Sequence, residues 1–217
     1  MDCKAPMLIK ILIADDHVIV RRGLRQILEE TSDISICAEA ANGQEVLQQI
    51  ASQTVDVLVL DITMPGRSGL DILKEIRQLC PKLPVLVLSM HAEDQFAARV
   101  LKAGAAGYLT KESAPEELVK AIRKVHGGGK YISSTQAEKL VYLLDTTSQQ
   151  MPHEGLSDRE YEVLRMIGSG KTVTEIAEEI KLSVKTISTY RTRILEKMKL
   201  RTSAELTHYA IKNRLVE

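Results

Sequence analysis

The chain has 217 residues, of which 44% are hydrophobic and 27% charged, and this favours a globular protein with one medium-sized and one small domain. Only 3% of the residues are aromatic and Trp is absent, which argues against the aromatic stacking surfaces that bind single-stranded nucleic acids. The net charge is zero, but residues 181–201 hold seven Lys and Arg against the single acidic Glu196, so positive charge gathers where a nucleic acid could bind.

Short apolar runs alternate with amphipathic segments through the first half of the chain, which indicates β-α-β units and a parallel sheet buried on both faces. The expected strands are 8–14, 34–40, 56–60, 84–89 and 106–110. The expected helices are 17–30, 43–52, 69–79, 93–103 and 114–126. Ser113 is the expected N-cap of the last helix. We predict a doubly wound α/β domain with a five-stranded parallel, flavodoxin-like sheet over residues 1–127.

The second half has a purely helical pattern. Residues 128–154 are interpreted as a linker, with a possible short helix at 137–144. A capping box of Ser157 and Glu160 then marks the start of a helix. The expected helices are 157–168, 172–180, 184–199 and 202–213. We predict a small all-α domain of four helices over residues 155–217.

Polar residues stand at the carboxyl ends of four expected strands, which is where the ligand site of an open parallel sheet lies. They are Asp15, Asp16, Asp61, Ser89 and Lys111. An isolated Asp after a strand is usually a helix cap, but caps do not explain all five together. Three carboxylates so close favour a hard divalent cation, Mg²⁺. A carboxylate beside such a metal can attack phosphorus, with Lys111 and Ser89 contacting the phosphorylated product.

Four segments at these positions resemble a known family. They are ADDH (14–17), VLVLDITMPGRSG (57–69), VLVLSMHA (85–92) and AAGYLTK (105–111). Together they resemble the receiver domain of bacterial two-component response regulators, and the resemblance spans residues 7–128. Glu112 stands where many receivers have Pro, a departure that does not affect Lys111.

The resemblance implies that Asp61 is the phosphoacceptor. It also implies that Asp16 and Asp61 bind Mg²⁺ directly, together with the backbone carbonyl of Thr63, and that Asp15 holds the ion through water.

The same resemblance implies that Ser89 and Lys111 sense the phosphoryl group. Tyr108 is similar to the aromatic residue that turns inward on activation. His17 and His91 flank the pocket, and neither is given a role.

Residues 172–200 have the helix, short break and longer helix of a helix-turn-helix. On the longer helix the apolar stripe is Ile187, Tyr190, Ile194 and Met198. Short polar side chains and cations occupy the other face, as a helix in the major groove requires.

The segment 156–200 resembles the LuxR-type C-terminal domain of NarL/FixJ response regulators. This implies that helix 184–199 reads DNA and that helix 202–213 can pair two subunits. Tyr190 replaces the usual His of the pattern. By position, the base-reading candidates are Ser188, Thr189 and Thr192, and the phosphate contacts are Lys185, Arg191, Lys197 and Lys199.

We therefore predict a two-component response regulator in which a sensor histidine kinase phosphorylates Asp61. Phosphorylation is expected to control binding of a homodimer to double-stranded promoter DNA, and RNA polymerase is a possible further partner. Three cysteines without CxxC spacing, no signal-peptide pattern and no long apolar stretch indicate a cytoplasmic protein. It is not expected to be an enzyme, apart from self-phosphotransfer and autodephosphorylation at Asp61. One alternative is a Mg²⁺-dependent phosphohydrolase, although Thr63 occupies the position of that pattern's general acid. Another is a phosphorylation switch that acts only on protein partners.

Overall fold

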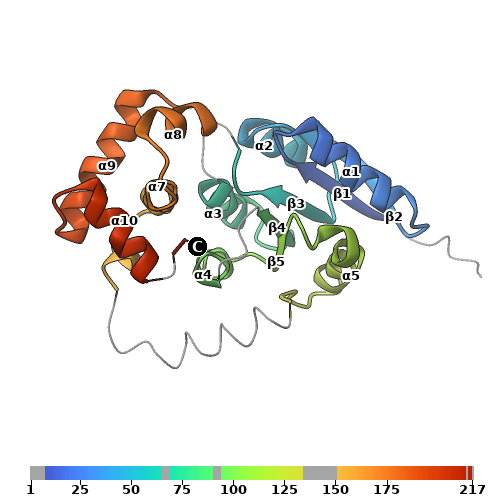
Figure 1. Cartoon of the computed structure of the whole chain (residues 1–217). Helices are drawn as coiled ribbons and strands as arrows, with labels where there is room; N and C mark the ends of the chain where they lie inside the picture. Colours follow the sequence, from blue (N-terminus) through green and yellow to red (C-terminus); the bar gives the residue numbers. More distant parts are fainter. Residues whose placement is uncertain (1–7, 65–68, 90–93, 134–150, 214, 217) are drawn as a thin grey trace, which may run out of the picture. The chain divides into compact units, whose positions relative to one another are not determined.

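The computed structural model describes residues 8–64, 69–89, 94–133, 151–213 and 215–216 (Figure 1). The chain divides into two compact units, Met1–Leu140 and Val141–Glu217, which are described separately. Among the described residues, no helix is both long enough and apolar enough to cross a membrane.

The first unit is built on a sheet of five parallel strands in the order β2-β1-β3-β4-β5, as predicted. The strands are β1 (Ile9–Ala14), β2 (Ile34–Ala40), β3 (Val57–Asp61), β4 (Val85–Ser89) and β5 (Gly107–Thr110). Every residue of β3 and β4 is buried, because helices cover both faces of the sheet and the central strands have no solvent side.

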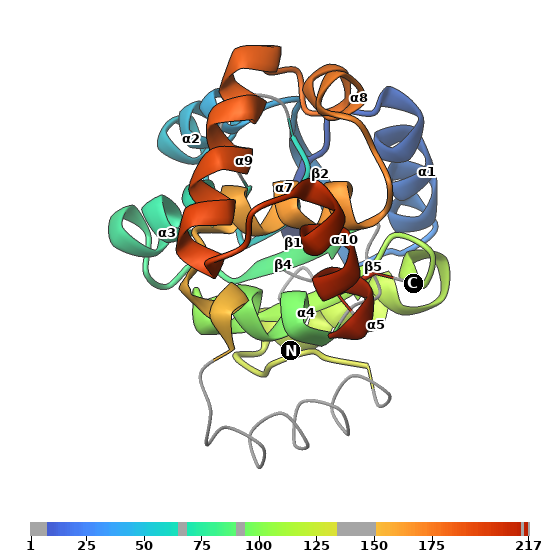
Figure 2. The same ribbon diagram turned by 60° about the vertical axis from the view of Figure 1, so that its left-hand side comes forward.

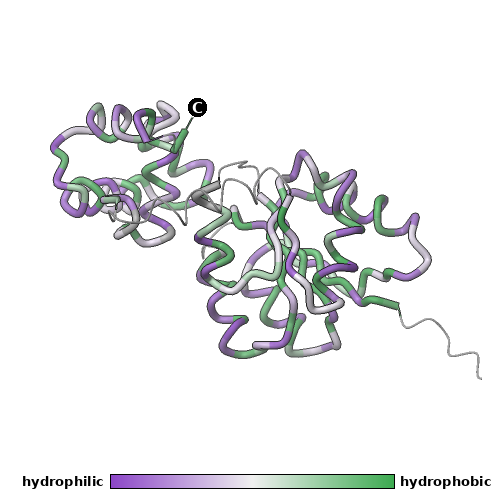
Figure 3. Tube along the Cα trace, turned by 90° about the horizontal axis from the view of Figure 1, so that it is seen from below, coloured by the Kyte–Doolittle hydropathy of each residue, from purple (hydrophilic) through white to green (hydrophobic). Residues whose placement is uncertain are grey.

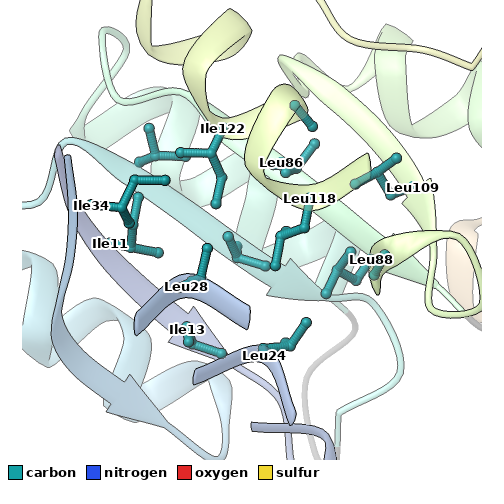
Figure 4. Close-up of a cluster of buried hydrophobic side chains, with 14 of the residues drawn as sticks. Ile11, Ile13, Leu24, Leu28, Ile34, Leu86, Leu88, Leu109, Leu118 and Ile122 are labelled. Carbon is teal, nitrogen blue, oxygen red and sulfur yellow. The ribbon is translucent and has the colours of Figure 1, made fainter. Parts of the chain in front are cut away.

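Five helices cover this sheet. They are α1 (Val18–Glu29), α2 (Gly43–Ser52), α3 (Gly69–Leu79), α4 (Asp94–Lys102) and α5 (Ala114–His126). The chain runs from β1 outward to β2 and then back through β3, β4 and β5. Because crossovers between parallel strands are right-handed, this reversal puts α1 on one face and α2, α3 and α4 on the other. Figure 4 shows Leu24 and Leu28 of α1 sharing a core with Leu118 and Ile122 of α5, so α5 covers the same face as α1.

After α5 the chain returns to the edge of the sheet at Tyr131. The Tyr131 N–H donates to the Ala106 carbonyl and the Tyr131 carbonyl accepts from the Tyr108 N–H, both at 3.0 Å. Gly107 lies beside this contact, where a Cβ would stand 2.8 Å from the Tyr131 carbonyl oxygen. Tyr131, which falls within the linker predicted from residue 128, thus forms an isolated bridge with Gly107 at the edge of the sheet. The possible helix at 137–144 lies outside the described residues.

The second unit is helical, as predicted. It contains the 3₁₀ turn η1 (Pro152–Gly155) and the helices α7 (Asp158–Gly168), α8 (Val173–Glu179), α9 (Val184–Met198) and α10 (Ser203–Lys212). The turn η1 was not predicted, and it covers the last three residues of the expected linker and the first residue of the expected helical domain. Figure 2 shows the short connection between α8 and α9 that makes the helix-turn-helix.

Side-chain caps explain where the helices of the second unit begin. Ser157 and Thr172 form capping boxes with Glu160 and Glu175, and the Ser183 side chain accepts from the Thr186 N–H. In the first unit, by contrast, Ser113 precedes α5 without a side-chain capping bond, because its hydroxyl bonds to Thr110 instead. The helices of both units alternate between hydrophobic and hydrophilic stretches (Figure 3), which is the pattern of helices with one face on a core.

Candidate functional site

The structure brings the predicted acidic residues and Lys111 together at the carboxyl edge of the sheet. Asp15 and Asp61 are fully buried. The Nζ atom of Lys111 lies 2.6 Å from Oδ2 of Asp15 and 2.8 Å from Oδ2 of Asp61. Asp16 and His17 belong to the same cluster, in which one potential ligand atom from each residue and from Asp15 and Asp61 lies within 4.8 Å of the others. The edge of the sheet thus forms one compact acidic site.

Acidic side chains outnumber ammonium groups in the part of this site that the structure describes. Burial, together with repulsion from Asp15, raises the pKa of Asp61, although the Lys111 ammonium group opposes the shift. Burial alone would lower the pKa of Lys111, but the attraction of Asp61 and Asp15 outweighs it and the pKa is raised, so this ammonium group stays charged. The carboxyl groups of Asp15, Asp16 and Asp61 lie together in this cluster, and Lys111 brings one ammonium group to Asp15 and Asp61. A divalent cation with a preference for oxygen ligands fits both this charge and this donor set.

Backbone groups hold the carboxylates in place. The Asp15 N–H donates to the Ala40 carbonyl at 3.1 Å, and the His17 N–H donates to Oδ1 of Asp15 at 2.8 Å. At the end of β3, the Thr63 N–H donates to Oδ1 of Asp61 at 3.0 Å. The bonds from His17 and Thr63 limit the rotation of the two carboxyl groups, and the bond from Thr63 opposes the rise in the pKa of Asp61.

Ser89 and Tyr108 lie on neighbouring strands of the same unit, and both are fully buried. The Lys111 N–H donates to the Ser89 carbonyl at 2.8 Å, so the chain at Ser89 is joined directly to the Lys111 loop. Leu109 packs into the core shared with α1 and α5. Since neighbouring residues of a strand point to opposite faces, Tyr108 points to the face covered by α4. His91 lies outside the described residues.

Arg21 is a residue of this site that the sequence interpretation missed. Its Nη1 atom donates to the Asp15 carbonyl at 2.6 Å, and its Nε atom donates to Oε2 of Glu39 at 2.9 Å. The available signal was weak. Arg21 and Arg25 are four residues apart, and so on one helix face, but nothing in the sequence identifies what that face meets.

In the second unit, α9 has the two faces that its pattern predicts. Ile187, Ile194 and Met198 are buried, and Tyr190 is half-buried. Thr189 and Thr192 are exposed and Ser188 is half-buried. The two Thr hydroxyl groups donate to the carbonyls of Lys185 and Ser188 within the helix, so each can still accept a hydrogen bond from a partner. The exposed face therefore offers short, polar, acceptor-rich side chains.

The four predicted phosphate contacts fall into two groups. Lys185, Lys197 and Lys199 are exposed, as such contacts require. Arg191, by contrast, is half-buried and donates to the Ser203 hydroxyl at 3.4 Å. Lys197 forms an ion pair with Oε2 of the buried Glu160 at 2.6 Å. These last two cations join α9 to α10 and α7 within the unit.

The Lys197 ion pair changes the acidity of its partner. Burial would raise the pKa of Glu160, but Lys197 and the Ser157 backbone outweigh it and the pKa is lowered. The Glu160 carboxylate is also the capping-box residue of α7, since it accepts from the Ser157 N–H at 2.7 Å. A single carboxylate thus holds both the start of α7 and the end of α9.

Two families match the chain, one for each unit. The response regulator receiver domain matches residues 11–123, and the luxR family of bacterial regulatory proteins matches residues 154–210. Response regulator UvrY of Escherichia coli is 38% identical over 209 residues, which is 96% of each chain. Oxygen regulatory protein NreC of Staphylococcus epidermidis is 38% identical over 216 residues, covering 96% of this chain and 99% of NreC.

Among solved structures, the chain is similar to RcsB from Salmonella enterica serovar Typhimurium bound to promoter rprA in the presence of the phosphomimetic BeF₃⁻. The TM-score is 0.66 at 28% identity, and the similarity covers 93% of this chain and 98% of that one. The family matches, the parallel sheet with its acidic edge and the helix-turn-helix all indicate the same family. The chain belongs to the NarL/FixJ-type two-component response regulators, with a receiver domain followed by a LuxR-type DNA-binding domain that regulates transcription.

Proposed function

We propose that Asp61 accepts a phosphoryl group from a sensor histidine kinase and that this phosphorylation controls sequence-specific binding of α9 to promoter DNA. One observation carries the assignment of Asp61. Its buried carboxylate lies 2.8 Å from the Lys111 ammonium group and within the cluster that contains Asp15 and Asp16. Such a site combines a nucleophile with groups that stabilise charge on a transferred phosphoryl group.

Asp15, Asp16 and Asp61, with the Thr63 carbonyl, are the residues that would hold Mg²⁺. An ion bound there would supply positive charge to neutralise the phosphoryl oxygens. An Asp61 carboxylate oxygen attacks phosphorus, and the bond from phosphorus to the donor group breaks. The Lys111 ammonium group then pairs with a phosphoryl oxygen, and the Ser89 hydroxyl donates to another. Besides this self-phosphotransfer and autodephosphorylation, in which water attacks phosphorus and inorganic phosphate leaves Asp61, we propose no enzymatic activity.

Tyr108 is proposed as the switch residue because it lies on β5 opposite Val87, two residues before Ser89 on β4, and is fully buried. Phosphorylation would change the surface formed by β4, β5 and α4, and two copies of the chain would then pair on DNA half-sites. The solved complex of RcsB with promoter rprA in the presence of phosphomimetic BeF₃⁻ supports, by similarity, DNA binding in a phosphorylated state. A dimer on a promoter would have RNA polymerase as a further partner, and the cytoplasm is its proposed location.

The test uses the full chain, acetyl phosphate as the phosphodonor, and Asp61→Asn. Wild-type protein should show a phosphorylated band on an affinity gel, and Asp61→Asn should not. The matched control is Asp71→Asn, which removes an exposed carboxylate at the start of α3 and should label normally. Labelling of Asp61→Asn would refute the assignment.

DNA binding is tested by electrophoretic mobility shift with a salt titration, using promoter fragments before and after phosphorylation. Tighter binding after phosphorylation is expected for the wild type alone. If no fragment binds in either state, a switch that acts on protein partners replaces the proposal. Turnover of small phosphate esters would instead favour the phosphohydrolase.

A further inference from the structure

We propose that Arg21 is a positioning residue for the metal-binding loop: its guanidinium group fixes the peptide that joins Asp15 to Asp16 and thereby sets the affinity of the site for Mg²⁺. The inference rests on the proposed function of the acidic cluster and assigns a role to a residue outside it.

Arg21 spans the gap between the loop after β1 and the end of β2. It is in the first turn of α1, and its side chain is only 14% exposed. One edge of the guanidinium group contacts the Asp15 carbonyl oxygen, with Nη1 at 2.6 Å, and the Nε atom contacts Glu39 of β2 at 2.9 Å. Arg21 therefore ties the loop to the strand next to it.

The Asp15 carbonyl needs this partner because the regular pairing of the sheet ends there. The last ladder bond between β1 and β2 at this edge runs from the Asp15 N–H to the Ala40 carbonyl at 3.1 Å. A buried carbonyl beyond the ladder must find another donor, and a charged donor makes a stronger bond than a neutral one. Since the same peptide group carries the nitrogen of Asp16, a tilt of this peptide displaces the Asp16 carboxylate.

Only an arginine can make both contacts, one with the Asp15 carbonyl and one with the Glu39 carboxylate. A guanidinium group presents several donors in a rigid plane, whereas a lysine ammonium group is a single point charge. Glu39 is held in turn by Arg25, which helps to keep it ionised: the hydrogen bond from Arg25 lowers the pKa of Glu39 against the effect of burial. Arg25 bonds to Glu39 and Glu29, and none of its hydrogen bonds reaches the loop. It is therefore a matched control for Arg21.

Calorimetric titration of the full chain with Mg²⁺ tests the proposal. Residues that orient metal ligands typically change metal affinity by about tenfold or more when they are replaced. Arg21→Ala should weaken Mg²⁺ binding by about this factor, and Arg21→Lys should fall between Arg21→Ala and the wild type. Arg25→Ala, which removes a neighbouring partner of Glu39, should bind within about twofold of the wild type.

A second readout separates positioning from a general structural role. The rate of labelling by acetyl phosphate is measured against Mg²⁺ concentration. Arg21→Ala should need more Mg²⁺ for half of its maximal rate, yet reach the wild-type rate at saturation, because Asp61 and Lys111 are unchanged. If thermal melting shows that Arg21→Ala is not folded, Arg21→Lys and Glu39→Gln carry the same test.

The outcomes distinguish the two proposals. Asp16→Asn should bind Mg²⁺ much more weakly than the wild type; if both bind alike, the proposed metal site itself is wrong. If Asp16→Asn loses binding while Arg21→Ala and Arg21→Lys bind as the wild type does, only the role of Arg21 is refuted. If Arg21→Ala has a lower maximal labelling rate but needs the same Mg²⁺ concentration for half of it, the positioning role of Arg21 is also refuted.

Discussion

Replacing Lys111 by Met should destabilise the receiver domain strongly in the absence of divalent cations. The Lys111 side chain is only 8% exposed and lies within 2.8 Å of two buried carboxylates, Asp15 and Asp61. Methionine preserves most of the side-chain volume but removes the only cation in contact with both carboxylates among the described residues. Breaking a buried ion pair from one side typically costs about 3–5 kcal/mol, because a charge is left buried without its partner.

Urea unfolding followed by circular dichroism, in buffer with EDTA, measures this loss in the receiver transition. Lys120→Met, on the exposed face of α5, is the control and should change stability by less than about 0.5 kcal/mol. Adding Asp61→Asn to Lys111→Met should restore part of the loss, since the double variant buries one charge fewer. Excess Mg²⁺ should restore part of it as well, because a bound ion stabilises the folded state alone.

A loss below about 1 kcal/mol would refute this reasoning, because that is the value of an exposed ion pair. Strict additivity of the two substitutions would refute it independently. In either case the carboxylates would be compensated by something other than Lys111.

Three further predictions concern other parts of the chain. Gly107→Ala should lower the receiver's melting temperature and cost about 1–3 kcal/mol, because the new Cβ would lie 2.8 Å from the Tyr131 carbonyl oxygen. The pKa of Glu160 is below its ordinary value of 4.5. The ionised Glu160 carboxylate therefore contributes its full stabilisation above pH 4.5, and this stabilisation is lost as the pH falls through the lowered pKa. The melting temperature of Glu160→Gln should thus depend less on pH in this range than that of the wild type. Lys185→Ala should weaken binding to all DNA sequences alike and reduce the slope of log affinity against log salt by about 1, as measured by mobility shift, whereas Lys120→Ala should change neither. An unchanged melting temperature, pH dependence or salt slope would contradict the corresponding prediction.

The fold was predictable because its signals are local. Continuous apolar runs identified the strands, and the helices began within one or two residues of the expected positions, where caps such as Ser157 and Ser183 are readable from sequence. The turn η1 was missed because a four-residue 3₁₀ helix has too few residues to show a periodic pattern.

Contacts between distant segments were not predictable in the same way. The ion pair of Lys197 with Glu160 depends on how α9 crosses α7, and 37 residues separate the two partners. The return of Tyr131 to β5 and the bond from Arg21 to the Asp15 carbonyl likewise depend on the packed fold. The position of the carboxylates was predictable, since the carboxyl ends of parallel strands meet at one edge of the sheet however the side chains pack.

The two hydrogen bonds at Tyr131 also act as a mechanical joint. A pull on the chain after Ser133 is borne first by the bonds to Ala106 and Tyr108, that is, by the backbone of the proposed switch residue. Tension in the connecting segment would therefore act on β5 directly, without passing through any side chain. Such a force would act on the backbone of β5, which pairs with β4, the strand that ends at Ser89.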